Sequence, residues 1–191
     1  MKAPKFLILI SALGILCTTG MKCKKDKVGI DALPPATREG KNTFGCLVNG
    51  KVFVPKGSNL GGPILSSYYQ YLDSPSAKGY FFNVSATMKN RNGNGTEGVN
   101  INSNNLIIKQ GQSYMLKNSG QDGEIYGSYG LTIGINSNDF TTKGQFRGEL
   151  YISTFDEIKQ IVSGTFWFDA VNDQGEKVEV REGRFDVHFV R

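Results

Sequence analysis

The sequence predicts an all-β fold, most simply an antiparallel sandwich of two sheets, with a curled barrel of calycin type as the alternative. Runs of β-branched and aromatic residues recur along the chain, separated by strings of Gly, Asn, Asp and Ser. No long window shows the 3.6-residue apolar period of an amphipathic helix. An Asn-Gly dipeptide also joins two short apolar runs, which is a strong signal for a β-hairpin. Such regular alternation of strands and turns is typical of sandwiches and barrels.

The first hairpin is expected at 44–48 and 51–55, because Asn49-Gly50 supplies the positive φ angles of a type I′ turn. Pro55 should end the second of these strands or lie at a sheet edge. A short helix is the alternative at 103–109 or at the corner 156–159. The further strands are expected at about 64–72, 79–89, 98–108, 112–117, 124–135, 145–154, 160–171 and 177–190.

The last two expected strands show the clearest alternation. Phe166 and Phe168 share one face of the first. In the second, Phe and Val alternate with Arg184, Asp186 and His188, which share the opposite, polar face. Glycines that stand two residues before an aromatic residue are expected to mark bulges or bends rather than ligand contacts. These glycines are Gly79, Gly144, Gly164 and Gly183.

The N-terminus has the layout of a lipoprotein-type signal peptide over residues 1–22. A basic start precedes an apolar run at 6–17 and a small polar exit. The run is shorter than the roughly 20 residues that span a bilayer. Cys23 is the expected lipid attachment site, and Cys17 is the alternative. Cleavage without a lipid is a third possibility, because Lys22 is large for the position before a lipidated cysteine.

The rest of the chain is expected to form a tether at 23–43 and one domain at 44–191. Pro34-Pro35 favours an extended tether that holds the domain away from a membrane. The chain carries 22 basic and 17 acidic side chains, and three of the lysines leave with the signal. A mature net charge of about +2, without a basic cluster inside the domain, argues against nucleic acid as a partner.

Three segments resemble a family of Bacteroidetes lipoproteins that is built on an all-β domain of unknown function. They are the Cys-Lys-Lys-Asp start at 23–26, the hairpin at 42–54, and the strands at 161–169 through 182–186. The resemblance implies export, a lipid anchor and an all-β domain. It provides no catalytic residues for this chain. The expected location is the cell envelope, at the outer membrane.

No catalytic or metal-binding constellation emerges from the sequence. His188 is the only histidine and is expected to be an ordinary surface residue, and Cys46 is expected to be a buried apolar residue. One histidine and one cysteine in the domain cannot form a usual zinc site. The acidic string from Asp169 to Glu176 is interpreted as a polar hairpin turn, with a weak calcium site as the alternative. The expectation is a protein without cofactor or metal that is not an enzyme.

Aromatic residues offer the one candidate binding surface, at Tyr68, Tyr69 and Tyr71. The simpler interpretation is that the fold covers both faces of this strand. Three functions stay open. A scaffolding or binding protein of the envelope, with a glycan or an envelope protein as partner, is the leading one. A glycan-binding module predicts an exposed aromatic cleft. A hydrolase predicts converging carboxylates, for which Glu149, Glu179 and Glu182 are the candidates.

Overall fold

The computed structural model describes residues 28–56, 63–75, 77–90 and 93–191. The predicted signal peptide and the two candidate lipid attachment sites, Cys17 and Cys23, lie outside the described residues. The described chain forms one short 3-10 helix, η1 (Gly29–Ala32), and strands that confirm the all-β prediction. The strands are β1 (Thr43–Val48), β2 (Lys51–Phe53), β3 (Leu65–Ser74), β4 (Ala77–Lys89), β5 (Gly95–Ser103), β6 (Ser113–Leu116), β7 (Ile125–Ile133), β8 (Asn136–Thr141), β9 (Gly148–Asp156), β10 (Ile161–Val171) and β11 (Lys177–His188).

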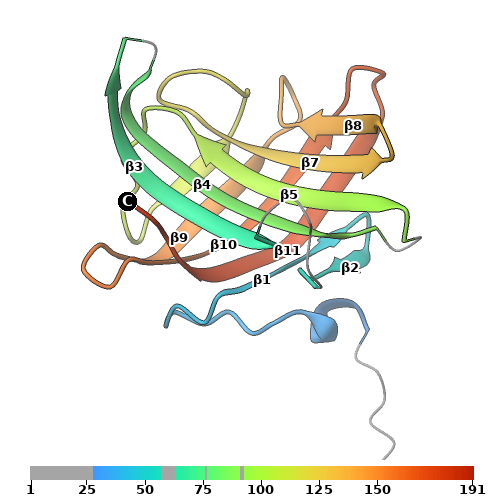
Figure 1. Cartoon of the computed structure of the whole chain (residues 1–191), viewed down its shortest axis with the longest axis horizontal. Coiled ribbons are helices and arrows are strands. Elements are labelled where there is room, and N and C mark those ends of the chain that lie inside the picture. Colours follow the sequence, from blue (N-terminus) through green and yellow to red (C-terminus); the bar gives the residue numbers. More distant parts are fainter. Residues whose placement is uncertain (1–27, 57–62, 76, 91–92) are drawn as a thin grey trace, which may run out of the picture.

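The strands belong to one continuous sheet in the order β2-β1-β11-β10-β9-β6-β7-β5-β4-β3, with β8 beside β7. The neighbours are antiparallel except β6 and β7. The sheet curls so that its two ends approach each other (Figure 1). Val190, just beyond β11, forms a parallel bridge with Tyr68 on β3. The continuous sheet and its facing halves combine features of the two arrangements that the sequence left open, the sandwich and the curled barrel.

The inner face of this curled sheet holds the core. Phe168 and Phe185 are almost fully buried there and, with Phe166, form an aromatic cluster. Cys46 is also buried, as predicted, and burial raises the pKa of its thiol, which disfavours the reactive thiolate. Asn49 and Gly50 have the expected positive φ angles of the hairpin turn, at 48° and 73°.

Three segments differ from the strands or short helices that the sequence suggested. The strand expected at 124–135 ends at Ile133, and a turn at 134–135 leads into β8, which was not expected as a separate strand. The residues at 104–109 are neither helix nor strand. The corner at 156–159 is a turn rather than a helix, because the Asp156 carboxylate accepts hydrogen bonds from the N–H groups of Ile158 and Lys159.

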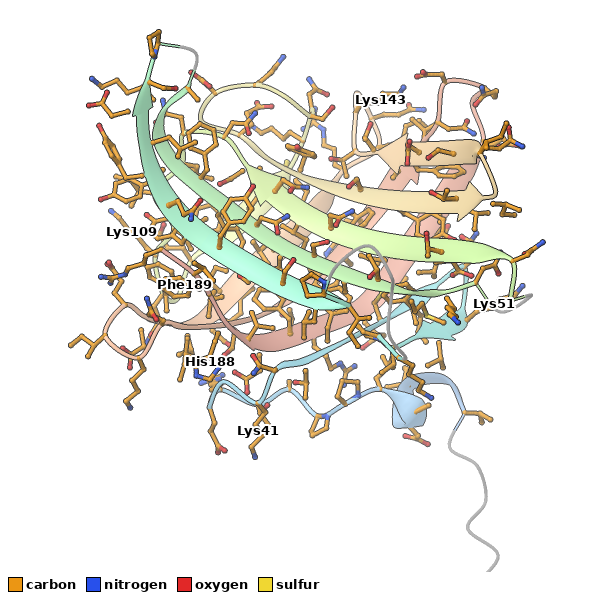
Figure 2. The ribbon with its side chains drawn as sticks, in the orientation of Figure 1. Lys41, Lys51, Lys109, Lys143, His188 and Phe189 are labelled. Atoms are coloured by element: carbon orange, nitrogen blue, oxygen red, sulfur yellow. The ribbon has the colours of Figure 1, made fainter. Side chains whose placement is uncertain are left out.

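The predicted tether is partly docked on the sheet. Residues 33–42 lie along β1 and the end of β11, and Figure 2 shows Lys41 close to His188. The buried carboxylate of Asp186 accepts hydrogen bonds from the Thr37 hydroxyl and from the N–H groups of Glu39, Gly40 and Lys41. These residues therefore belong to the folded unit, which shortens the stalk that the sequence suggested.

Candidate functional site

The three predicted tyrosines do not form one surface. Tyr69 points into the core, where burial raises the pKa of its hydroxyl to about 12. Tyr68 lies on the opposite face of β3. The residues paired with it in turn across β4, β5 and β7 end at Tyr126, which lies on the same face of the sheet, two strands beyond β4. Tyr71 is 52% exposed and packs against Tyr80, with ring centroids 5.1 Å apart. Alternation along the strand separates Tyr68 from the other two.

A better-built site lies on the outer face of β9, β10 and β11, in a groove of about 550 Å³ that we call the Trp167 groove. Trp167 is the only tryptophan of the chain and is 44% exposed, although its neighbours Phe166 and Phe168 are buried. Glu149 stands opposite Trp167 on β9. The side chains and backbone around the groove come from Ala36, Glu149, Tyr151, Thr165, Phe166, Trp167, Arg181, Glu182, Gly183 and Arg184.

A β-bulge in β11 shapes one side of the groove. Arg181 and Glu182 together stand opposite the single residue Trp167, because the register with β10 shifts between Phe166 and Phe168. Glu182 has a φ of 54°, a left-handed conformation that is costly for a residue with a side chain. Gly183 follows, and a Cβ atom there would lie 2.5 Å from the Phe166 ring. Strained bulges of this kind are frequent beside binding and active sites.

The bulge holds two guanidinium groups beside the indole. The Arg181 guanidinium lies 5.5 Å from the centre of the Trp167 ring, within the range of a cation–π contact. It donates to the carbonyl oxygens of Phe168 and Val180, both at 3.0 Å, and pairs with the Asp169 carboxylate. The Arg184 side chain is only 18% exposed and donates to the carbonyl and the carboxylate of Glu182. Both arginines are therefore held in fixed orientations.

The groove is electrically balanced. Two carboxylates, Glu149 and Glu182, and two guanidiniums, Arg181 and Arg184, line it. The Glu149 carboxylate accepts a hydrogen bond of 2.9 Å from the Ser113 hydroxyl on β6. The docked N-terminal segment contributes Ala36 to the wall. The site thus offers an aromatic face surrounded by hydrogen-bond donors and acceptors.

The other residues that the sequence singled out have structural partners. The Asn172 side chain organises the turn between β10 and β11 by accepting from the N–H groups of Gln174 and Glu176. Asp173 pairs with Lys143. Within the described ranges, no three His, Cys, Asp or Glu side chains gather as a metal site would require. His188 is exposed, and its backbone N–H donates to the Asn42 side chain.

Sequence reasoning missed Trp167 as a site residue, although a signal was present. Phe166 and Phe168 share the inner face of their strand, so the residue between them must point outward. A large aromatic residue on the outer face is the informative exception to burial. No sequence pattern marked Arg181 and Glu182 as site residues. Their positions depend on the β-bulge, and strand alternation does not predict a bulge.

A second hollow, of about 750 Å³ and mostly apolar, lies between β1 and the start of β3. Its border includes Pro55 and Pro63, and residues 57–62 between them lie outside the described residues. Helices with the length and apolarity to cross a membrane are absent from the described part of the chain. No protein-family model, curated protein or solved structure matches the chain with significance.

Proposed function

We propose that this protein is a non-enzymatic binding module of the bacterial cell envelope and that its Trp167 groove binds a neutral glycan. The observation that carries the proposal is the half-exposed indole of Trp167 between paired carboxylates and guanidiniums. A ligand for this groove needs one apolar face for the indole and a rim of polar groups. A sugar ring has this form, with C–H groups on its faces and hydroxyl groups at its edge.

Each element of the groove has a role in this proposal. The indole stacks against the C–H face of the sugar and buries apolar surface. The carboxylates of Glu149 and Glu182 accept hydrogen bonds from hydroxyl groups, and Arg184 donates them. Such charge-assisted hydrogen bonds are stronger than neutral ones. Because salt bridges hold Arg181 and Arg184 in place, little side-chain entropy is lost on binding.

The charge balance favours a neutral glycan over an acidic one. Two negative and two positive side chains line the groove, and both guanidiniums already have carboxylate partners. An anionic ligand would therefore have to compete with Asp169 and Glu182 for the arginines. The same argument disfavours nucleic acid, whose binding depends on unpaired basic side chains that neutralise phosphates.

Binding is favoured over hydrolysis by the surroundings of the two carboxylates. A glycosidase needs one carboxylic acid that stays protonated near neutral pH, and burial in an apolar pocket is the usual cause. Glu149 and Glu182 are both exposed, and one contacts Ser113 while the other pairs with Arg184. Neither has the apolar enclosure that would make it a general acid.

Trp167 provides a direct assay of the proposal. Because it is the only tryptophan, fluorescence excited at wavelengths that tyrosine does not absorb reports on the groove alone. We expect one or more neutral oligosaccharides from a glucan, xylan, mannan and chitin panel to change this fluorescence saturably, and heparin and hyaluronan fragments to leave it unchanged. Replacing Trp167 with Ala should weaken binding at least about tenfold in calorimetry, as loss of a central aromatic contact does.

Met115 supplies the matched control. It is exposed on the same outer face, opposite Glu149 on β6, but it does not line the groove. Met115→Ala should keep both the fluorescence response and the affinity. Binding that survives Trp167→Ala, or a preference for the acidic glycans, would contradict the proposal. Release of reducing sugar by the wild type and not by Glu149→Gln would replace binding with hydrolysis.

The envelope location is a part of the proposal that rests on the sequence. We expect the protein from its host membranes to begin at Cys23 and to carry acyl groups, because residues 1–22 have the layout of a lipoprotein signal. The intact mass measures this directly. Replacing Cys23 with Ser should release the protein from the membrane fraction, whereas Cys17→Ser should not. A soluble, unmodified chain that starts near residue 23 would contradict the lipid anchor.

A further inference from the structure

We propose that the outer edge of β3, from Tyr69 to Asp73, binds an extended peptide of a partner protein by strand addition. This site lies on a different strand from the Trp167 groove and does not depend on the proposed glycan function. β3 is the last strand of the sheet order, and β4 is its partner on one side. Among the described residues, its other side pairs only with Val190. Figure 1 shows the β3–β4 hairpin extending past this point.

The hydrogen-bond pattern identifies which backbone groups face the open edge. Successive residues of a strand direct their N–H and C=O groups to opposite sides. The Tyr69 N–H donates to the Val190 carbonyl, and the Ser67 carbonyl accepts from the Val190 N–H. The register between β3 and β4 continues without a shift to Ser74. Odd-numbered residues therefore face the outer edge, and those beyond Val190 are Tyr71 and Asp73.

These groups match a further strand. In the described part of the chain, no strand pairs with β3 on this side beyond Val190. The outer edge thus presents a row of backbone groups that a further strand could pair with. These groups are the Tyr69 carbonyl, the N–H and carbonyl of Tyr71, and the Asp73 N–H. Unpaired edges of this kind are templates for another chain, and peptide-binding domains use them in this way.

A pocket of about 450 Å³ lies beside the same edge and can hold a peptide side chain. Tyr71, Leu72 and Tyr80 contribute aromatic and apolar surface to it. Tyr80 is fixed by stacking on Tyr69, with ring centroids 4.9 Å apart, and Tyr69 contacts Phe155 and Phe189 of the core. Figure 2 marks Phe189 near this end of the sheet. The aromatic surface is therefore backed by the core.

The charges beside the pocket indicate the kind of side chain. Glu157 and Arg191 also line it, and they pair with each other at 3.0 Å. Because this pair is already neutral, a charged peptide residue would find no unpaired counter-ion there. The pocket thus favours an uncharged aromatic or branched aliphatic residue, while the edge binds the peptide backbone on either side of it.

A flexible peptide fits this edge better than a second copy of the chain. Antiparallel pairing of two β3 edges about Tyr71 would place Asp73 of one copy opposite Tyr69 of the other. The Tyr69 N–H is already bonded to the Val190 carbonyl, so Val190 stands where the second copy would have to continue. Two copies could pair over only two or three residues, whereas a peptide can bend past Val190 and still place a side chain in the pocket.

Hydrogen exchange of individual amides tests the proposal. The probe is a library of heptapeptides that alternate Val and Thr around one randomised central residue. In the protein alone, the amides of Tyr71 and Asp73 should exchange fast, while those of Gln70 and Leu72, which face β4, exchange slowly. A saturating peptide with an aromatic or branched aliphatic centre should slow exchange at Tyr71 and Asp73 at least about tenfold, as new ladder hydrogen bonds do.

Substitutions on the two faces of β3 provide the matched pair. Tyr71→Ala removes the exposed wall of the pocket and should weaken peptide binding about tenfold. Tyr68→Ala removes an exposed aromatic residue from the opposite face and should leave the affinity unchanged. Trp167→Ala should also leave it unchanged, which keeps this test separate from that of the glycan groove.

Three results would overturn the proposal. The first is that no peptide of the library binds. The second is binding without slower exchange at Tyr71 and Asp73, which would place the peptide elsewhere. The third is slower exchange at these amides when the protein alone is concentrated, which would make the edge an interface between two copies of the chain.

Discussion

Replacing Asp186 with Asn is expected to lower the free energy of unfolding by about 3 kcal/mol and to release residues 33–42 from the sheet. The Asp186 carboxylate is fully buried and accepts hydrogen bonds from the backbone N–H groups of Glu39, Gly40 and Lys41. The Thr37 and Ser163 hydroxyls also donate to it. An amide would turn a donor toward these donors, and hydrogen bonds to a charged group contribute roughly 1.5–3 kcal/mol each.

Urea unfolding and limited proteolysis measure the two effects. The variant should unfold at lower urea and be cleaved within 33–42 while the sheet remains folded. Asp173→Asn is the control, because Asp173 is an exposed carboxylate that pairs with Lys143 at the surface. Wild-type stability of Asp186→Asn, with the segment still protected from protease, would show that the carboxylate does not hold it.

The same carboxylate predicts the acid sensitivity of the fold. Burial by itself would raise the pKa of Asp186, but hydrogen bonds from Thr37, Ser163 and the backbone outweigh it and hold the pKa well below its ordinary value. Near pH 4 the unfolded chain therefore binds more protons at this residue than the folded chain does. The stabilisation is complete above the unfolded pKa of about 3.9 and is lost as the pH falls through the lower folded value.

Urea unfolding measured between pH 6 and pH 2 tests whether the stabilisation by Asp186 falls as the pH falls. The stability difference between wild type and Asp186→Asn should be largest at pH 6 and should shrink as the pH approaches 2. A difference that stays constant over this range would mean that protonation of Asp186 is not coupled to folding.

Replacing Gly183 with Val is expected to cost about 3 kcal/mol and to disturb the Trp167 groove. A Cβ atom at this position would lie within 2.6 Å of three atoms of the Phe166 ring, and Phe166 is packed in the core beside Phe44 and Phe185. Overpacking of this kind typically costs 1–3 kcal/mol or more, because neighbouring side chains must leave their preferred rotamers. Thermal unfolding measures the loss, and a shifted Trp167 emission reports on the groove.

Glu182→Gly, at the neighbouring position, should not lower the stability of the protein. Glu182 adopts a left-handed conformation, so glycine relieves strain there at the cost of one surface ion pair with Arg184. We expect unchanged stability or a gain of up to about 1 kcal/mol. Should Gly183→Val prove harmless while Glu182→Gly destabilises the protein, the bulge would not have the geometry described.

The sequence by itself determined most of the strands, though not β8, and which of their faces carry the core. Phe185, Val187 and Phe189 face the core as their alternation predicts, and Asn49-Gly50 forms its turn, because both depend on neighbours within a few residues. The export signal and Cys23 are likewise properties of a short segment, and they stay predictions. Strand alternation also fixed the outward direction of Trp167, although its importance went unrecognised.

Only the tertiary structure decided which distant residues meet. Asp186 lies on the polar face of its strand in the sequence, yet it is buried, because residues 37–41 fold over it. Arg181 reaches Trp167 through a bulge, and Val190 ends the pairing of β3 at Tyr69. Each of these contacts depends on register or on chain segments more than ten residues apart. Local patterns carry no information about them, because the same strands could pair in other orders.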